Sequence, residues 1–302
     1  MVNVGAKDSS QNNLSRAVWY LQHVAYNSTL RLFHEAPRVA SNTYWIASDN
    51  LLAFKALEPY DPQLSSTIKS ELIRLAKFYN LLRSSDGLPL SMRYDVIIND
   101  NATLEIPPRN VTHMTLYQDS YTLKYDIANG TGNFTDWRKY ADLRLLTALS
   151  DHNAGDEDNA ISNFTAAENM WDGIGLRDLG FNNSYGEGQG PGNPNAYATY
   201  KLGLLLYVSG KLGIHLPFES EVMNRIWLMQ NQTSGGIFTH IMPDGSSGTS
   251  DTNTETTTMV ILGITSITQN STQPTPEFDP STLMLCVVVL LSSLILQRIR
   301  RN

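Results

Sequence analysis

Asp49 and Glu255 are the two carboxylates of this 302-residue sequence that we expect to carry acid–base chemistry. Asp49 lies four residues after Trp45 and three before Leu52, so it falls on the apolar face of a predicted helix. A carboxyl group that loses water on such a face has a raised pKa, which suits it to donate a proton. The alternative is a structural carboxylate that caps a neighbouring helix or accepts a hydrogen bond from a tyrosine hydroxyl.

Glu255 ends the tetrapeptide Thr252-Asn253-Thr254-Glu255 at the start of a predicted helix. This spacing is typical of a capping box, in which Thr252 bonds one free amide of the first turn and Glu255 reaches back to another. In the alternative interpretation this helix start faces a substrate cleft, with His240 close by on the preceding predicted strand. His240 is then a candidate base, although a lone histidine is more often a structural residue.

A pair of carboxylates about 5–10 Å apart can hydrolyse a glycosidic bond, whereas uronate lyases use tyrosine, histidine or carboxylate bases. Asp172 is a further candidate, shortly before a glycine-rich stretch at residues 186–192. This stretch lacks the Lys-Ser/Thr ending of a phosphate-binding loop and fits the flexible rim of a cleft. The candidate stacking platforms for sugar rings are Trp45, Trp171, Tyr185 and Tyr200, although Tyr200 also fits ordinary core packing.

Other acidic residues are more simply interpreted as structural. Asp142 lies four residues after Arg138, which predicts an ion pair on a solvated face. Candidate calcium ligands are Asp151, Asn153, Asp156 and Asp158. Their order differs from that of a calcium loop, and Ser162 stands where such a loop closes with glutamate. Acids before a helix start are also favoured by its dipole, so we expect no metal and no other cofactor.

Helical periodicity predicts eight helices, at residues 12–26, 42–57, 63–82, 135–150, 159–170, 195–209, 217–230 and 252–267. Asp61-Pro62 supplies an N-cap and a first helical residue for the third of them. Aromatic and β-branched residues predict strands at 94–98, 103–106 and 114–125, and a short one at 236–241. The fold class is therefore predicted to be mainly α, with a small β-hairpin insertion at about residues 88–125.

Two stretches give a resemblance to known folds. Residues 45–53 read WIASDNLLA, and the pair GGIFTH at 235–240 and NTETT at 253–257 follows near the end. Together with the helix spacing they resemble α/α-toroids, as in six-hairpin glycosidases and terpenoid-cyclase or prenyltransferase barrels. The Asp-rich motifs of terpenoid cyclases and the zinc ligands of prenyltransferases are missing. The resemblance implies a toroid of helical hairpins that acts on carbohydrate, and four hairpins leave this toroid incomplete.

The C-terminal end of the sequence has the pattern of a membrane anchor. Residues 281–297 carry no charge, and the length of this stretch is near the lower limit for a transmembrane helix. Arg298, Arg300 and Arg301 follow it. The positive-inside rule places residues 298–302 in the cytoplasm. We therefore expect a single-pass protein of the cell membrane, with an extracellular domain at residues 1–268 and a Pro/Thr-rich stalk at 269–280.

Pro276-Glu277-Phe278, the apolar stretch and the basic end follow one another in the order of a known signal. They resemble the PEF-type C-terminal anchor of archaeal surface proteins. Asp279 departs from the proline that often follows in this family, which puts processing of the anchor in doubt. No secretory signal peptide precedes the first predicted helix, so we expect a missing N-terminal piece, with insertion as a tail-anchored protein as the alternative.

Composition supports an exterior location. The formal net charge is −7, which argues against a nucleic-acid partner. The single cysteine, Cys286, lies in the predicted span, so it excludes internal disulfides and multi-thiolate metal sites. Ten Asn-x-Ser/Thr triplets are candidate glycosylation sites, at Asn13, Asn27, Asn101, Asn110, Asn129, Asn133, Asn163, Asn182, Asn231 and Asn270.

The leading hypothesis is a membrane-anchored surface glycoprotein that cleaves carbohydrate as a hydrolase or a lyase. The rival is a non-catalytic envelope module that binds polysaccharide or neighbouring envelope glycoproteins. The two differ in expected geometry. An enzyme gathers Glu255 and either Asp49 or Asp172 in one pocket with aromatic side chains, whereas a module disperses these residues or uses them in helix caps.

Overall fold

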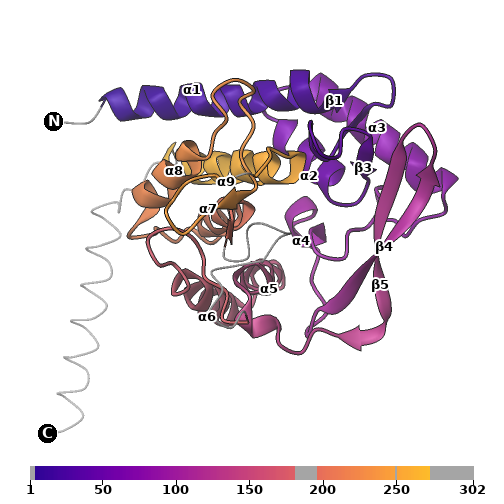
Figure 1. Ribbon diagram of the computed structural model, residues 1–302. Coiled ribbons are helices and arrows are strands. Elements are labelled where there is room, and N and C mark those ends of the chain that lie inside the picture. Colours follow the sequence, from indigo (N-terminus) through magenta and orange to yellow (C-terminus); the bar gives the residue numbers. More distant parts are fainter. Residues whose placement is uncertain (1–3, 181–195, 249, 273–302) are drawn as a thin grey trace, which may run out of the picture. The chain divides into compact units, whose positions relative to one another are not determined.

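The computed structural model describes residues 4–180, 196–248 and 250–272 (Figure 1). The helices are α1 (Val4–Tyr20), α2 (Asp49–Leu57), α3 (Pro62–Phe78), α4 (Asp95–Ile98), α5 (Ala141–Asn153), α6 (Glu157–Glu168), α7 (Tyr200–Leu212), α8 (Glu219–Leu228) and α9 (Thr254–Thr272). A π-helical turn, η1 (Leu21–Ala25), continues α1, and a 3-10 turn, η2 (Trp137–Lys139), precedes α5. The described residues up to Ile267 form one compact unit, which carries all the features below.

Among the described residues, seven strands make three small sheets. They are β1 (Tyr26–Asn27), β2 (Leu32–Phe33), β3 (Thr43–Trp45), β4 (Arg109–Gln118), β5 (Thr122–Asn133), β6 (Tyr197–Ala198) and β7 (His240–Ile241). β4 and β5 form a long antiparallel hairpin, and β3 pairs in parallel with β5 to give the order β3-β5-β4. β1 pairs with β2 and β6 with β7, both antiparallel. The three-stranded sheet therefore contains both parallel and antiparallel pairs.

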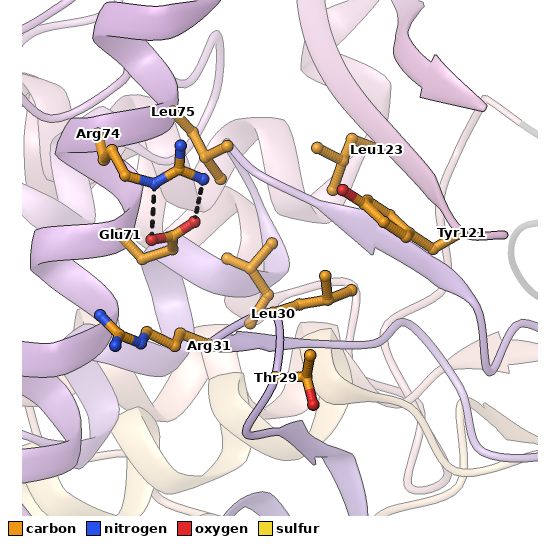
Figure 2. Close-up of a pocket in the computed structure, with 9 residues that line it drawn as sticks. Thr29, Leu30, Arg31, Glu71, Arg74, Leu75, Tyr121 and Leu123 are labelled. Carbon is orange, nitrogen blue, oxygen red and sulfur yellow. Dashed lines mark hydrogen bonds and ion pairs between the residues drawn. The ribbon is translucent and has the colours of Figure 1, made fainter. Parts of the chain in front are cut away.

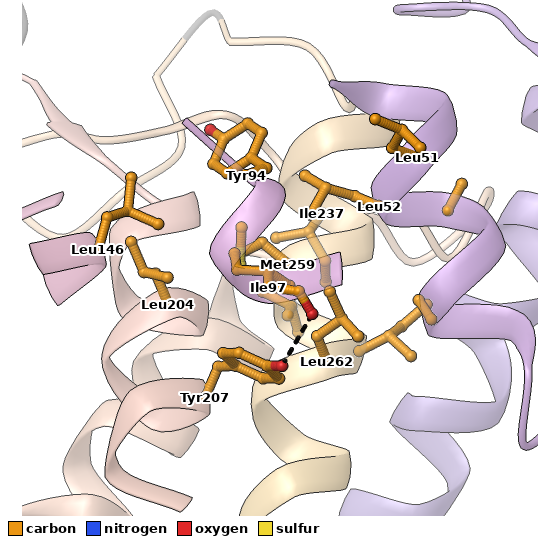
Figure 3. Packing of buried hydrophobic residues seen from close by; sticks show 14 of the residues in the cluster. Leu51, Leu52, Tyr94, Ile97, Leu146, Leu204, Tyr207, Ile237, Met259 and Leu262 are labelled. Atoms are coloured by element: carbon orange, nitrogen blue, oxygen red, sulfur yellow. Dashed lines mark hydrogen bonds between the residues drawn. The ribbon is translucent and has the colours of Figure 1, made fainter. Parts of the chain in front are cut away.

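The core is built around α2, α7 and α9, and Figure 3 shows side chains of these helices meeting those of α4. Gly203 of α7 and Gly263 of α9 lie where the two helices cross closely. A Cβ added at Gly203 would come within 2.7 Å of the Met259 backbone, and one at Gly263 within 2.3 Å of the Gly203 carbonyl oxygen. Such small residues let two backbones approach where larger side chains would hold them apart.

Local sequence explains how the elements next to the site begin. Asp61 caps α3 as predicted, because its side chain accepts a hydrogen bond from the Leu64 amide at 3.0 Å. Asn50, fully buried in the first turn of α2, bonds the amide and carbonyl of Phe33 and the carbonyl of Trp45. These three bonds fix the start of α2 against β2 and the end of β3.

The prediction of a mainly α toroid is wrong. Helices account for 47% of the structure and strands for 17%, and one of the sheets is mixed. Residues 94–98, predicted as a strand, form the N-cap and body of α4, and the predicted helix at 42–57 begins only at Asp49. The preceding residues pair with β5 instead, because the hairpin of β4 and β5 offers a free edge to residues 43–45. Tertiary pairing of this kind overrides local helical periodicity.

The predicted C-terminal transmembrane helix is not supported either. Among the described residues, the helices are all too short or too polar to cross a membrane. The predicted span at 281–297 and the basic tail at 298–302 lie outside the described residues, as does the stalk from residue 273 onward. The first residues of that stalk, 269–272, belong to α9 rather than to an extended segment.

Candidate active site

A cavity of about 410 Å³ lies at the N-terminal ends of α2 and α9, facing the three-stranded sheet. We call it the acidic pocket because four carboxyl groups line it. Its lining consists of Glu35, Trp45, Ser48, Asp49, Arg93, Tyr94, Val111, His113, Asp126, Asn253 and Glu255. These residues come from α2, α9, β3, β4, β5 and the loop before α4, so the pocket forms only in the folded chain.

Asp49 is the most deeply buried acid of the pocket, with 3% of its surface exposed. Its Oδ1 accepts a hydrogen bond from the Ser48 hydroxyl at 3.2 Å, and its Oδ2 has no hydrogen-bond partner among the described residues. Burial raises the pKa of Asp49 well above its usual value, and the carboxylates of Glu255 and Glu35 raise it further. Burial and the neighbouring carboxylates thus both favour the protonated form of Asp49.

Glu255 lies in the first turn of α9, where the Tyr94 hydroxyl donates a hydrogen bond to its Oε1 at 2.6 Å. The expected capping box does not form. Asn253 caps the helix instead by accepting a bond from the Thr256 amide at 2.9 Å, while the Thr254 amide donates to the Glu35 carbonyl oxygen. The Glu255 side chain is thereby available to the pocket rather than to its own helix end.

Trp45 lies at the side of the pocket formed by the sheet. Its Nε1 donates to the Glu35 carboxylate at 3.0 Å, and the ammonium group of Lys124 lies 4.8 Å from the ring centroid. The ring of His113 meets it edge-on at a centroid distance of 4.6 Å. His113 Nδ1 in turn lies 2.8 Å from Asp126 Oδ1. The indole is thus held by contacts on several sides, which fixes the orientation of an aromatic wall.

Asp142, Lys201 and Asp178 form a buried charge network, whereas the sequence predicted a solvated ion pair for Asp142. Asp142 is 5% exposed rather than solvated, and it accepts a hydrogen bond from the Tyr200 hydroxyl at 2.9 Å. The Lys201 ammonium lies 3.7 Å from Asp142 and also pairs with Asp178. Although burial opposes ionisation, Lys201 and then Arg93 lower the pKa of Asp142. Tyr200, a predicted substrate-binding residue, is therefore engaged in this network and does not line the pocket.

Three other predicted site residues lie outside the acidic pocket. Asp172 accepts hydrogen bonds from the Tyr197 hydroxyl and from the Ile174 amide, so it holds a tight turn. Trp171 stacks on Phe218 with a centroid distance of 5.3 Å and an interplanar angle of 9°. His240 lies in β7, where burial lowers its pKa. One more predicted site residue, Tyr185, lies outside the described residues, as does the glycine-rich stretch at 186–192.

Three of the four candidate calcium ligands, Asp151, Asn153 and Asp156, have structural partners. Asp151 accepts from the Asn163 amide group at 2.9 Å, and Asn153 donates to the carbonyl oxygens of Val96 and Ala102. Asp156 is the N-cap of α6, with Asp158 in the first turn of the same helix. Within the described ranges, no group of three or more His, Cys, Asp or Glu side chains is arranged to hold a metal ion.

The candidate glycosylation sites differ in the state of the asparagine side chain. The Asn27 amide group donates to the Tyr44 hydroxyl at 2.9 Å, and that of Asn163 donates to Asp151. Asn231 accepts bonds from the amides of two following residues. Asn101 and Asn133 are exposed, and Asn13 and Asn110 are partly buried. The side chains of Asn129, Asn182 and Asn270 are not among those described.

Two further cavities are less suited to catalysis. One cavity, of about 300 Å³, is lined by residues that include Arg31, Glu71, Arg74 and Tyr121. Figure 2 shows that Glu71 and Arg74 are joined by two hydrogen bonds, so their opposite charges already pair with each other. The other, of about 630 Å³, contains Asp95, whose pKa burial raises to about 6. Its described lining contains no aromatic side chain and no basic one that could pair with a substrate charge.

Of the predicted residues, Asp49, Glu255 and Trp45 lie together in the acidic pocket. Sequence reasoning missed Glu35, Arg93, Tyr94, His113 and Asp126, which reach it from separate elements. Arg93 and Tyr94 are adjacent where the predicted strand at 94–98 begins, and the sequence analysis gave neither of them a role in a site. No family model matches the chain, and no curated protein or solved structure shows significant similarity to it.

Proposed function

We propose that the acidic pocket hydrolyses a glycosidic bond, with Asp49 as the proton donor and Glu255 as the partner carboxylate. The observation that carries the proposal is the shared pocket of Asp49, a buried acid with a raised pKa and an Oδ2 without a described partner, and Glu255, a second carboxylate that accepts from Tyr94. Two carboxyl groups in different protonation states are what hydrolysis of an acetal requires. Trp45 supplies the aromatic wall on which a sugar ring can stack.

In the proposed reaction the Asp49 proton passes to the oxygen of the leaving sugar as the glycosidic bond breaks. Glu255 either takes a proton from the attacking water or forms the new bond to the sugar carbon, and water then releases the product. The two routes give products of opposite anomeric configuration. Proton NMR of the first products therefore distinguishes them.

The alternative chemistry, β-elimination from a uronate, needs a base that removes a proton from carbon. Tyr94 is poorly suited to this role, because burial and then the charge of Glu255 raise its pKa well above the usual value. Its hydroxyl is instead a good donor to Glu255. This favours hydrolysis over elimination within the carbohydrate-acting class.

The test is a screen of the full chain against neutral, cationic and anionic polysaccharides, with detection of new reducing ends and of unsaturated products. We expect reducing ends without unsaturated products, and a loss of about 100-fold or more in rate for Asp49→Asn and for Glu255→Gln. Glu221→Gln, on the exposed face of α8, is the matched control and should keep full activity. Turnover that survives both pocket substitutions rejects the assignment.

The rival hypothesis of a non-catalytic binding module makes a different prediction in the same screen. Under that hypothesis the chain binds an oligosaccharide without releasing any product, and Asp49→Asn leaves binding intact. The raised pKa of Asp49, in a pocket that holds a second carboxylate, favours catalysis over binding alone.

A further inference from the structure

The charges around the acidic pocket are unequal. Glu35, Asp49, Asp126 and Glu255 line it with four carboxyl groups, against the basic groups of Arg93 and His113. The His113 ring lies against Asp126, 2.8 Å from its carboxylate oxygen. The Arg93 charge acts on Asp142 in the network behind the pocket, as well as on Tyr94. Among the described lining residues, carboxyl groups outnumber basic groups by four to two.

The neighbouring charges that change the pKa of Asp49 most are also negative. After burial, the largest contributions to its raised pKa come from the carboxylates of Glu255 and Glu35, with a further one from Asp126. A substrate carboxylate placed here would meet the same repulsion that raises the pKa of Asp49. A cationic group would meet an attraction, which is strengthened by the partial exclusion of water from the cavity.

The second observation is the unsatisfied Asp49 Oδ2, a buried polar atom at the wall of this cavity. Buried polar atoms almost always have a hydrogen-bond partner, and an exception at a cavity wall indicates a ligand that supplies one. In the protonated form that the proposed function requires, this atom donates a hydrogen bond, which a sugar hydroxyl or glycosidic oxygen can accept.

We propose that the acidic pocket selects a sugar unit carrying a protonated amine, such as a glucosamine unit, over the matching N-acetylated or uronic-acid unit. This proposal rests on the proposed function for the sugar, but the selection by charge follows from the pocket itself. The ammonium group lies between Glu35 and Glu255, with Trp45 beside the ring. The Glu35 carboxylate also accepts a hydrogen bond from Trp45 Nε1. Glu35 therefore contacts both the proposed ammonium group and the aromatic side chain beside the sugar ring.

The experiment measures binding rather than turnover, so that it can fail separately from the proposed function. The protein is the full chain with Asp49→Asn, which keeps the neutral state of Asp49 and blocks proton donation. Titration calorimetry compares tetramers of glucosamine, N-acetylglucosamine and galacturonic acid at pH 6, where the glucosamine amine carries its charge. We expect the glucosamine tetramer to bind about tenfold more tightly than the N-acetylated one, the effect of one nearby opposite charge.

Substitution of Glu35 tests whether the pocket is the source of the selection. Glu35→Gln removes one charge but keeps an acceptor for Trp45, so the preference for glucosamine should fall by about tenfold. Glu221→Gln removes the same charge outside the pocket and should leave the preference unchanged. An equal fall in both variants would indicate attraction by the net charge of the whole chain, and this overturns the proposal.

The remaining outcomes are also decisive. Tighter binding of the N-acetylated or the uronic-acid tetramer overturns the proposal even if the chain proves to be a hydrolase. A preference for glucosamine that depends on Glu35, in a chain that releases no product from any polysaccharide, upholds the selection and rejects the hydrolase.

Discussion

Asp49 and Asp142 occupy the same kind of position with opposite results. Each lies in the first turn of a helix, and each is at most 5% exposed. Around Asp142, the Lys201 ammonium and the Arg93 guanidinium lower the pKa despite burial. Around Asp49, carboxylates raise the pKa that burial has already raised. The signs of the neighbouring charges, rather than the depth of burial, thus give the two aspartates opposite pKa shifts.

Among the substitutions that test this comparison, removal of Lys201 should change the free energy of unfolding most. Lys201→Met leaves Asp142 and Asp178 buried beside each other without their cation, so the free energy of unfolding should fall by about 3–5 kcal/mol. Urea denaturation at pH 7 measures the change. A loss below about 1 kcal/mol would mean that water already compensates these charges, and that the two aspartates differ less than the structure indicates.

Tyr94→Phe is expected to have a smaller effect. The Tyr94 hydroxyl bonds Glu255 at 2.6 Å, and loss of a hydrogen bond to a charged group costs about 1.5–3 kcal/mol. Part of this cost should appear as lost stability in urea denaturation, and part as a slower proposed hydrolysis. Tyr60→Phe is the control, since its partner is the neutral hydroxyl of Thr265, and it should leave any hydrolysis unchanged.

The pH dependence of stability should show the smallest effect, but with a sign that separates the two aspartates. Because the pKa of Asp49 is raised in the folded state, the folded chain binds a proton that the unfolded chain has released. Stability therefore falls as the pH rises from the unfolded value of about 4 toward the folded pKa. Asp49→Asn should remove this component from a series of urea titrations between pH 4 and 8.

Asp142→Asn provides the opposite case in the same titrations. Its folded pKa is lowered, so its contribution to stability is present above the unfolded value and is lost as the pH falls through the folded one. The substitution should flatten the acidic side of the stability curve, below about pH 4. If both variants change the curve in the same direction, burial alone governs the two sites.

Much of the helical structure could be predicted from the sequence, because its signals are local. Asp61-Pro62 both caps α3 and supplies its first residue, and α6, α8 and α9 begin within two residues of the predicted positions, whereas α5 and α7 begin six and five residues later than predicted. Residues 94–98 could not be predicted in this way. Their β-branched side chains favour a strand, but Val96 and Ile97 are buried in the core as part of α4. Tertiary burial of this kind has no local signal.

The candidate site could be predicted only in part, for a related reason. Asp49 stood out through its spacing from Trp45 and Leu52, although only Leu52 shares its helix, because Trp45 lies in β3 and α2 begins at Asp49. Glu35 and Asp126 reach the pocket through loop packing and strand pairing. Asp142 was misplaced because its helix begins at Ala141. Arg138 therefore belongs to the preceding turn, where its guanidinium lies 4.6 Å from the Trp137 ring. Spacing along a sequence has meaning only within one continuous helix.

The close crossing of α7 and α9 at Gly203 and Gly263 has a consequence for any redesign of this molecule. Gly263 is eight residues from Glu255 on one helix, roughly 12 Å at the helical rise. A methyl group added at either glycine would push α9 away from α7, and a rigid helix carries such a shift to its end. Two positions without any side chain thus set the alignment of a carboxylate that neither of them touches.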